Sequence, residues 1–178
     1  MIYYKDLPDE VASTFLKEID FKQVPYRPGF SFTIIDNDDC LTSAGKQWFK
    51  DRNIIIFDKS LLFQSTADTE HPVHNDGDHI DAAFNFVLNR QGELQFLGDV
   101  EGDLSIQDKV EDGRKFSFDR YRNVTKMTIV DRWQGHAGVV RIGEAHRTVT
   151  SSEPRFCLSI RIRTSSPVTK FDDLIKLF

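Results

Sequence analysis

The chain has 178 residues, of which 39% are apolar and 29% are charged, and this composition is typical of one globular domain with a sizeable core. The formal net charge is −5 and the lysines and arginines form no block, so we expect nucleic acid not to be a substrate. No stretch approaches the roughly 18 apolar residues that cross a bilayer, and residues 1–6 do not resemble a secretory signal. The two distant cysteines, Cys40 and Cys157, are expected to be free thiols in the reducing cytoplasm.

The first third of the chain predicts helices around a single strand. Apolar residues recur at helical spacing after Pro8, at Val11, Phe15, Leu16 and Ile19. Prolines and a glycine then interrupt the pattern between residues 25 and 29. We therefore expect a helix at 8–19, a break at 25–29, a strand at 30–35, a turn at 36–39 and a second helix at 43–52.

The remaining sequence is dominated by short strand patterns. In chain order we expect strands, or one interrupted strand, at 54–57 and 61–64, strands at 82–89 and 93–97, loops at 98–103 and 109–114, strands at 126–130 and 138–142, a strand and turn at 147–154, a strand at 155–162 and a short helix at 170–178. This order predicts a mainly β antiparallel sandwich or barrel with flanking helices. We expect one domain over 1–178, with a helical buttress at about 1–52 and a barrel at about 53–165.

His74 and Asp76 form a first candidate metal-binding pair. Residues two apart on a strand point to the same side, so an imidazole and a carboxylate at this spacing can meet on one ion. The pair alone is weak evidence, because Asn75, Gly77 and Asp78 are turn formers and a solvated loop explains them equally well.

His146 completes a set of three ligands. It follows a strand pattern and the Gly143 break, which places it at the mouth of a sheet. Two histidines and one carboxylate are the facial triad that holds Fe(II) in oxygenases while leaving open coordination positions. His136 competes for the distal position, because Arg147 follows it by eleven residues, but we prefer His146. His71 and His79 flank the pair without a matching acid.

Arg155 follows His146 by nine residues and begins an alternating strand. Its polar face contains Arg155, Cys157, Ser159 and Arg161, whereas the intervening residues are apolar. Such a face looks either at solvent or into a polar cavity. In a cavity, the guanidinium of Arg155 could bind a carboxylate through two hydrogen bonds.

Together these features resemble the Fe(II)/2-oxoglutarate-dependent oxygenase superfamily, in particular its prolyl-hydroxylase-like members. The resemblance covers about 61–162 and consists of His74-Asn75-Asp76, His146 and Arg155. It implies a double-stranded β-helix, a jelly-roll barrel of the cupin type. It also implies Fe(II) on His74, Asp76 and His146, 2-oxoglutarate on Arg155, O2 as co-substrate and ascorbate as a reductant. Asp76 argues against the related halogenases, which have a small residue there.

Two positions depart from the family pattern. The isopenicillin N synthase-like enzymes have Arg-x-Ser, whereas Cys157 occupies the serine position here. Ser159 could supply a hydroxyl to the co-substrate instead. Prolyl hydroxylases often place a tyrosine on the strand after the His-x-Asp loop, and here Asn85 is the candidate for a polar role in the pocket.

The resemblance therefore implies a dioxygenase that hydroxylates a peptide side chain or a small metabolite and releases succinate and CO2. Two alternatives stay open: a cupin-type metalloenzyme that uses the same ligands without 2-oxoglutarate, and a non-catalytic β-barrel binding module. The primary substrate cannot be derived from the residues. Loops on a rigid scaffold usually carry substrate contacts, so we expect them in 36–50 and 98–122.

Overall fold

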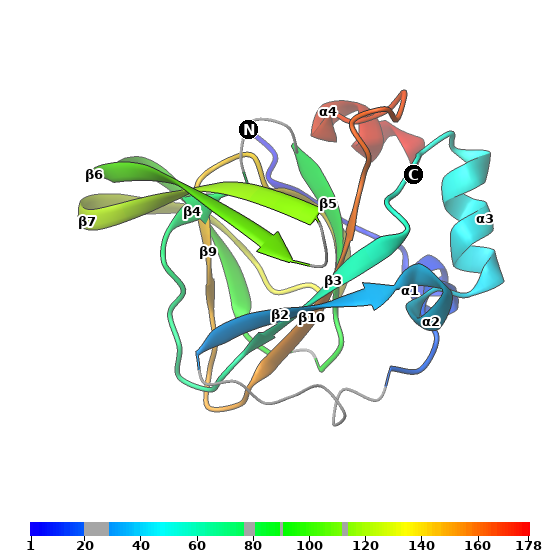
Figure 1. The fold of residues 1–178 in the computed structure, drawn as a ribbon, viewed down its shortest axis with the longest axis horizontal. Helices are drawn as coiled ribbons and strands as arrows, with labels where there is room; N and C mark the ends of the chain where they lie inside the picture. Colours follow the sequence, from blue (N-terminus) through cyan, green and yellow to red (C-terminus); the bar gives the residue numbers. More distant parts are fainter. Residues whose placement is uncertain (20–28, 77–80, 90, 112–113) are drawn as a thin grey trace.

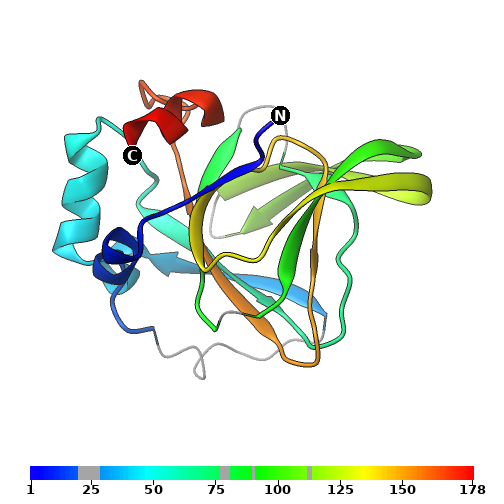
Figure 2. The same cartoon turned by 180° about the vertical axis from the view of Figure 1, so that it is seen from behind.

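The computed structural model describes residues 1–19, 29–76, 81–89, 91–111 and 114–178 (Figures 1 and 2). Its strands are β1 (Tyr4–Asp6), β2 (Phe30–Asp36), β3 (Lys59–Ser65), β4 (His74–Asn75), β5 (Ala82–Val87), β6 (Glu93–Glu111), β7 (Arg114–Trp133), β8 (Ala137–Arg141), β9 (His146–Val149) and β10 (Arg155–Arg161). Its helices are α1 (Asp9–Phe15), α2 (Asn37–Cys40), α3 (Ser43–Asp51), α4 (Phe171–Leu174) and the 3₁₀ helix η2 (Ile175–Leu177).

The strands form two antiparallel sheets. One has six strands in the order β1-β8-β5-β10-β3-β2, and the other is a closed ring of β4, β7, β6 and β9. The chain crosses repeatedly between them, because β3, β5, β8 and β10 belong to the first sheet and β4, β6, β7 and β9 to the second. This order defines a double-stranded β-helix, so the predicted fold class, a mainly β jelly roll with flanking helices, is confirmed.

The six-stranded sheet separates two apolar cores. On β5, Phe84 and Phe86 pack with the helical segments, whereas Ala83 and Val87 belong to a core between the sheets. The helices α1 and α3 lie at the end of the molecule opposite β4 and β9, as Figures 1 and 2 show. The period of two along β5 therefore assigns alternate side chains to the two cores.

The abundant phenylalanines concentrate in the helical core. The rings of Phe49 and Phe84 meet edge to face with centroids 4.9 Å apart, and the rings of Phe15 and Trp48 do so at 5.0 Å. Burying each such side chain contributes about 1.5–3 kcal/mol to folding. This cluster attaches the helices firmly to the sheet.

The helical predictions are confirmed in part. The second helix is α3, where the Thr42 hydroxyl accepts a hydrogen bond from the Gly45 N–H, and the C-terminal helix is α4 followed by η2. Helix α1 ends at Phe15 instead of residue 19, because Leu16 is extended and forms an isolated bridge to Leu41. The expected turn at 36–39 is wrong: Asp36 caps the short helix α2. The break expected at Pro25 and Pro28 lies outside the described residues.

The strand predictions fail mainly at the β6–β7 hairpin. The expected loop at 98–103 lies within β6, and residues 109–111 and 114 of the second expected loop belong to the strand ends. The strand expected at 126–130 is one part of the much longer β7. Residues 54–57 form no strand and contribute one isolated bridge through Ile56. The other strand predictions are confirmed within a few residues. The sequence did not suggest β1.

Among the described residues, no helix is long and apolar enough to cross a membrane. Cys40 and Cys157 are buried and free, as expected.

Candidate metal centre

The adjacent strands β4 and β9 bring the two predicted histidines together. His74 and His146 are cross-strand partners, and their ring centroids are 4.4 Å apart. Asp76 follows β4 directly, and its backbone N–H donates to the Ile142 carbonyl at 2.9 Å. One ligand atom from each of the three side chains lies within 4.8 Å of those of the other two. The structure therefore gathers the expected triad at one point.

Backbone carbonyls orient both imidazoles. Nδ1 of His74 lies 2.9 Å from the Pro72 oxygen, and Nδ1 of His146 lies 2.8 Å from the Glu144 oxygen. A carbonyl oxygen can only accept, so each Nδ1 must carry the hydrogen and each Nε2 keeps its lone pair. Nε2 of His74 is 3.8 Å from Oδ1 of Asp76. Two such nitrogens and one carboxylate oxygen fit a divalent first-row metal.

The electrostatics of the site favour the protonation states that bind metal. Burial, together with the neighbouring His74, lowers the pKa of His146 to about 4, so this imidazole is neutral at pH 7. Burial alone would raise the pKa of Asp76, but Arg161, His146 and His74 outweigh it and lower the pKa to about 2. Metal binding therefore displaces no proton from either group at neutral pH.

Arg161 holds the second oxygen of the candidate carboxylate ligand. Its Nη1 lies 2.6 Å from Oδ2 of Asp76, and both side chains are largely buried. The other oxygen of this carboxylate, Oδ1, lies near Nε2 of His74. The sequence placed Arg161 on the polar face of its strand but gave no sign of this partner, which comes from a segment 85 positions away.

The polar face of β10 looks into the molecule and not at solvent. Arg155 is only 4% exposed, and Ser159, which is fully buried, is the cross-strand partner of Asn85 on β5. Nε of Arg155, Oγ of Ser159 and Oδ1 of Asn85 are buried without a hydrogen-bond partner among the described residues. Each unsatisfied buried group costs about 1–3 kcal/mol. Such a face is suited to a polar ligand that would satisfy these groups.

The positive charge of Arg155 acts on the surroundings of the triad. Burial lowers the pKa of His71 to about 4, with contributions from His74 and then Arg155. Burial also raises the pKa of the Cys157 thiol, although Arg155 and Arg161 both act to lower it. Cys157 is therefore a neutral thiol on which both guanidinium groups act, at the position where the resembled enzymes have a hydroxyl.

The rival histidines lie outside the cluster of three. His136 is 36% exposed, and its Nε2 is 3.5 Å from Oδ1 of Asp9 on α1. Arg147, the arginine that follows His136 by eleven residues, donates hydrogen bonds to Glu70 and Gln95. His71 is buried near His74 without belonging to the cluster, and His79 lies outside the described residues.

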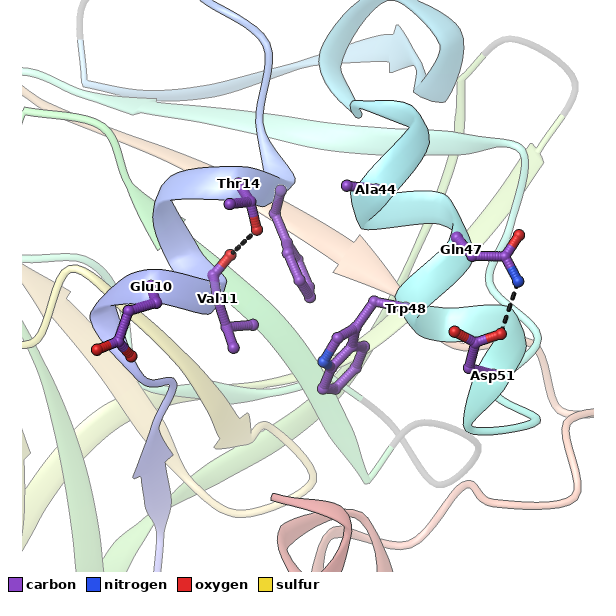
Figure 3. A pocket seen from close by; sticks show the side chains of 8 residues that line it. Glu10, Val11, Thr14, Ala44, Gln47, Trp48 and Asp51 are labelled. Atoms are coloured by element: carbon purple, nitrogen blue, oxygen red, sulfur yellow. Dashed lines mark hydrogen bonds between the residues drawn. The ribbon is translucent and has the colours of Figure 1, made fainter.

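A hollow with a volume of about 390 Å³ lies between α1 and α3 (Figure 3). Val11, Phe15 and Trp48 provide apolar walls, and polar side chains stand at its rim. It takes in part of the segment 36–50, which we expected to contact substrate, yet these helices lie at the opposite end of the molecule from β4 and β9 (Figure 1). The hollow is therefore separate from the candidate metal centre.

No protein-family model matches this chain, and no curated protein sequence matches it. Similar solved structures include Bacillus subtilis oxalate decarboxylase at pH 4.6, with 15% identity, a TM-score of 0.36 and coverage of 79% of this chain and 28% of that chain. An arginine-to-alanine mutant of the same enzyme has 13% identity, a TM-score of 0.38 and coverage of 89% and 32%. Peruvianin-I, a cysteine peptidase from Thevetia peruviana latex, has 12% identity, a TM-score of 0.36 and coverage of 90% and 77%.

The chain thus spans about a third or less of the length of the oxalate decarboxylases it matches. Likeness at this level carries no argument about activity, and the fold assignment rests on the strand order itself. Fold and site together define a jelly-roll protein with a candidate His-Asp-His metal centre at one end of its barrel.

Proposed function

We propose that this protein is an Fe(II)- and 2-oxoglutarate-dependent dioxygenase that hydroxylates a small molecule or a peptide side chain. The observation that carries the proposal is the pairing of a three-ligand centre with the buried guanidinium of Arg155. Counted from β3, His74 and Asp76 lie at the end of the second strand of the β-helix, His146 begins the seventh and Arg155 begins the eighth.

The chain's own residues would hold iron on one face. Nε2 of His74, Nε2 of His146 and Oδ1 of Asp76 would be the ligands, because the other atom of each group is already bonded. Three ligands leave three of six octahedral positions open, and iron bound there would supply the activation of O2. Arg161 would keep Asp76 monodentate by holding Oδ2.

Arg155 would bind the distal carboxylate of 2-oxoglutarate. Its guanidinium forms no ion pair with any acid among the described residues, and it lies on the interior face with Ser159 and Asn85. A bidentate carboxylate would neutralise this buried charge. In the overall reaction one atom of O2 enters succinate as CO2 leaves, and the other enters a substrate C–H bond to give an alcohol. Ascorbate would serve to keep the iron reduced.

A metalloenzyme that uses the same three ligands without 2-oxoglutarate is the second candidate. The neutral Cys157 thiol favours it, because a thiol is a weak hydrogen-bond donor at the position where the resembled enzymes offer a hydroxyl to the co-substrate. A non-catalytic barrel is the remaining alternative, and it predicts no tight metal binding by His74.

An anaerobic titration with Fe(II) and 2-oxoglutarate tests the proposal. We expect the visible metal-to-ligand charge-transfer band of the ternary complex in the wild type and in His136→Ala, and its loss in His146→Ala. Fe(II) binding without the band would favour the second candidate. Absence of metal binding would leave the non-catalytic barrel.

The role of Arg155 needs its own variant. Arg155→Gln should weaken 2-oxoglutarate binding about tenfold or more while Fe(II) affinity stays within a factor of about two, because the guanidinium would bind the co-substrate and is not one of the three candidate metal ligands. Arg147→Gln is the control, since that arginine is paired with Glu70 and Gln95. Equal 2-oxoglutarate affinity in Arg155→Gln and wild type would remove Arg155 from the site.

A further inference from the structure

The β6–β7 hairpin extends one face of the metal centre beyond the barrel. Arg120 on β7 is the cross-strand partner of His74, which is in turn the partner of His146. Directly opposed residues of an antiparallel pair share one face of the sheet. The face that carries the two histidines therefore continues through Arg120 onto the hairpin, which projects from the barrel in Figure 1.

This continuation is aromatic and basic. Phe118 and Arg122 lie two positions on either side of Arg120, so all three share the same face. The Phe118 ring meets the His74 ring edge to face with centroids 6.3 Å apart, which places it beside the metal ligands. The apolar residues Leu104 and Ile106 of β6 lie on the other face, opposite Tyr121 and Asp119.

Arg120 and Arg122 differ from most arginines of the barrel because they have no acidic ion-pair partner among the described residues. Ion pairs hold Arg132, Arg141, Arg147, Arg161 and Arg163. Neither Arg120 nor Arg122 forms an ion pair with a described residue, and Nε of Arg120 is buried without a hydrogen-bond partner. The cross-strand partner of Arg122 is Asp103, whose carboxylate accepts from Asn123 instead.

We propose that Arg120 and Arg122 bind an anionic group, a carboxylate or a phosphate ester, of the primary substrate, whose apolar part packs on Phe118. The proposal rests on the function proposed above and narrows its substrate to a compact organic anion. Cross-strand partners have Cα atoms about 4.5–5.5 Å apart, and Arg122 lies about 7 Å further along β7. A substrate held by Arg120 would thus present to the metal a carbon only a few bonds from its anionic group.

The test uses wild type, Arg120→Gln, Arg122→Gln and the control Arg132→Gln, whose arginine lies on the same strand and is paired with Glu93. Each iron-loaded protein is given a panel of carboxylates, the corresponding phosphate esters, and neutral amides and alcohols with the same carbon skeletons, and succinate release is measured. Stimulation should be confined to anionic members, and the two acid classes separate carboxylate from phosphate as the source. Arg120→Gln should raise KM for the active member about tenfold or more.

Two further readouts separate this proposal from the previous one. The Fe(II)–2-oxoglutarate band should be unchanged in Arg120→Gln. If the band is absent already in the wild type, the result contradicts the proposed function and not the anion site. Calorimetry with inorganic phosphate on the iron- and 2-oxoglutarate-loaded protein should show binding that Arg120→Gln abolishes and Arg132→Gln retains. Equal stimulation by neutral members, or no phosphate binding together with no active anion, would overturn the proposal.

Discussion

The Asp76 carboxylate divides its oxygens between two partners, and this division gives a residue-scale prediction. Arg161→Gln should weaken Fe(II) binding about 10- to 100-fold, because outer partners orient a metal ligand and here also keep it ionised. The affinity should fall further as the pH is lowered towards 5, since loss of the guanidinium lets burial raise the pKa of Asp76. Arg163→Gln is the control, since it removes the same charge from an exposed pair with Asp58 at 2.7 Å. Equal Fe(II) affinities in the two variants would show that Arg161 has no part in positioning Asp76.

Two buried imidazoles make the metal-free protein sensitive to acid. The pKa values of His71 and His146 are lowered from 6.5 to about 4 in the folded state, mainly by burial. Between pH 6.5 and 4 the unfolded chain therefore binds protons that the folded chain does not, so stability is lost as the pH falls through this window. The loss is at most roughly 3 kcal/mol for each histidine.

Urea unfolding of the metal-free protein between pH 7.5 and 4.5 measures this loss. His71→Gln should reduce the slope of stability against pH, because a glutamine takes up no proton. His136→Gln, which changes a half-exposed imidazole, is the control variant. A slope in His71→Gln identical to that of wild type would mean that His71 is not a source of the acid sensitivity.

The sequence could indicate the triad because its chemistry depends on short spacings. His74 and Asp76 are two positions apart, and a strand places such residues on one side. His146 was recognisable by its position after a strand pattern and a glycine. The partners that tune the site could not be found in this way. Arg161 meets Asp76 only through the crossing of the two sheets, and Arg120 meets His74 only through the part of β7 before residue 126, which the sequence did not suggest.

At the scale of elements, the β6–β7 hairpin explains why the fold was predicted only in part. Few of its described side chains are buried, so it lacks the apolar alternation that marked β5 and β10. Its glycines and aspartates at 98–103 suggested a loop, yet they form register shifts between paired strands, with Asp99 at φ 48°. Bulges of this kind preserve the pairing while adding residues, and a pattern of period two does not detect them.

Two glycines of this hairpin form a matched pair for a test. A Cβ at Gly102 would lie 2.7 Å from the Arg122 carbonyl oxygen, which is backbone, whereas a Cβ at Gly98 would meet only Cγ1 of the half-exposed Val130 at 2.9 Å. Gly102→Ala should therefore destabilise the hairpin by about 1–3 kcal/mol, and Gly98→Ala by clearly less, because a side chain can move aside. Amide hydrogen exchange at residues 120–124 measures the local effect, and protection that is equal in the two variants would contradict the role of Gly102. If Gly102→Ala weakens binding of the anionic substrate and Gly98→Ala does not, the geometry of the hairpin matters for the anion site proposed at Arg120 and Arg122.

At the scale of the whole molecule, the six-stranded sheet separates the helical core, which supplies stability, from the barrel interior, which holds the site. Phe84 is fully buried on the helical side and packs against Phe49 and Trp48, while the next residue, Asn85, faces the polar interior. Phe84→Ala should cost about 3–5 kcal/mol and lower the Tm by roughly 10 °C. Fe(II) affinity measured well below the Tm should stay within about twofold of wild type, because no metal ligand contacts this core. The control Ile55→Ala, at a side chain 42% exposed, should change stability by less than about 1 kcal/mol. A loss of metal affinity in Phe84→Ala at temperatures where the protein remains folded would show that the two layers are coupled through β5.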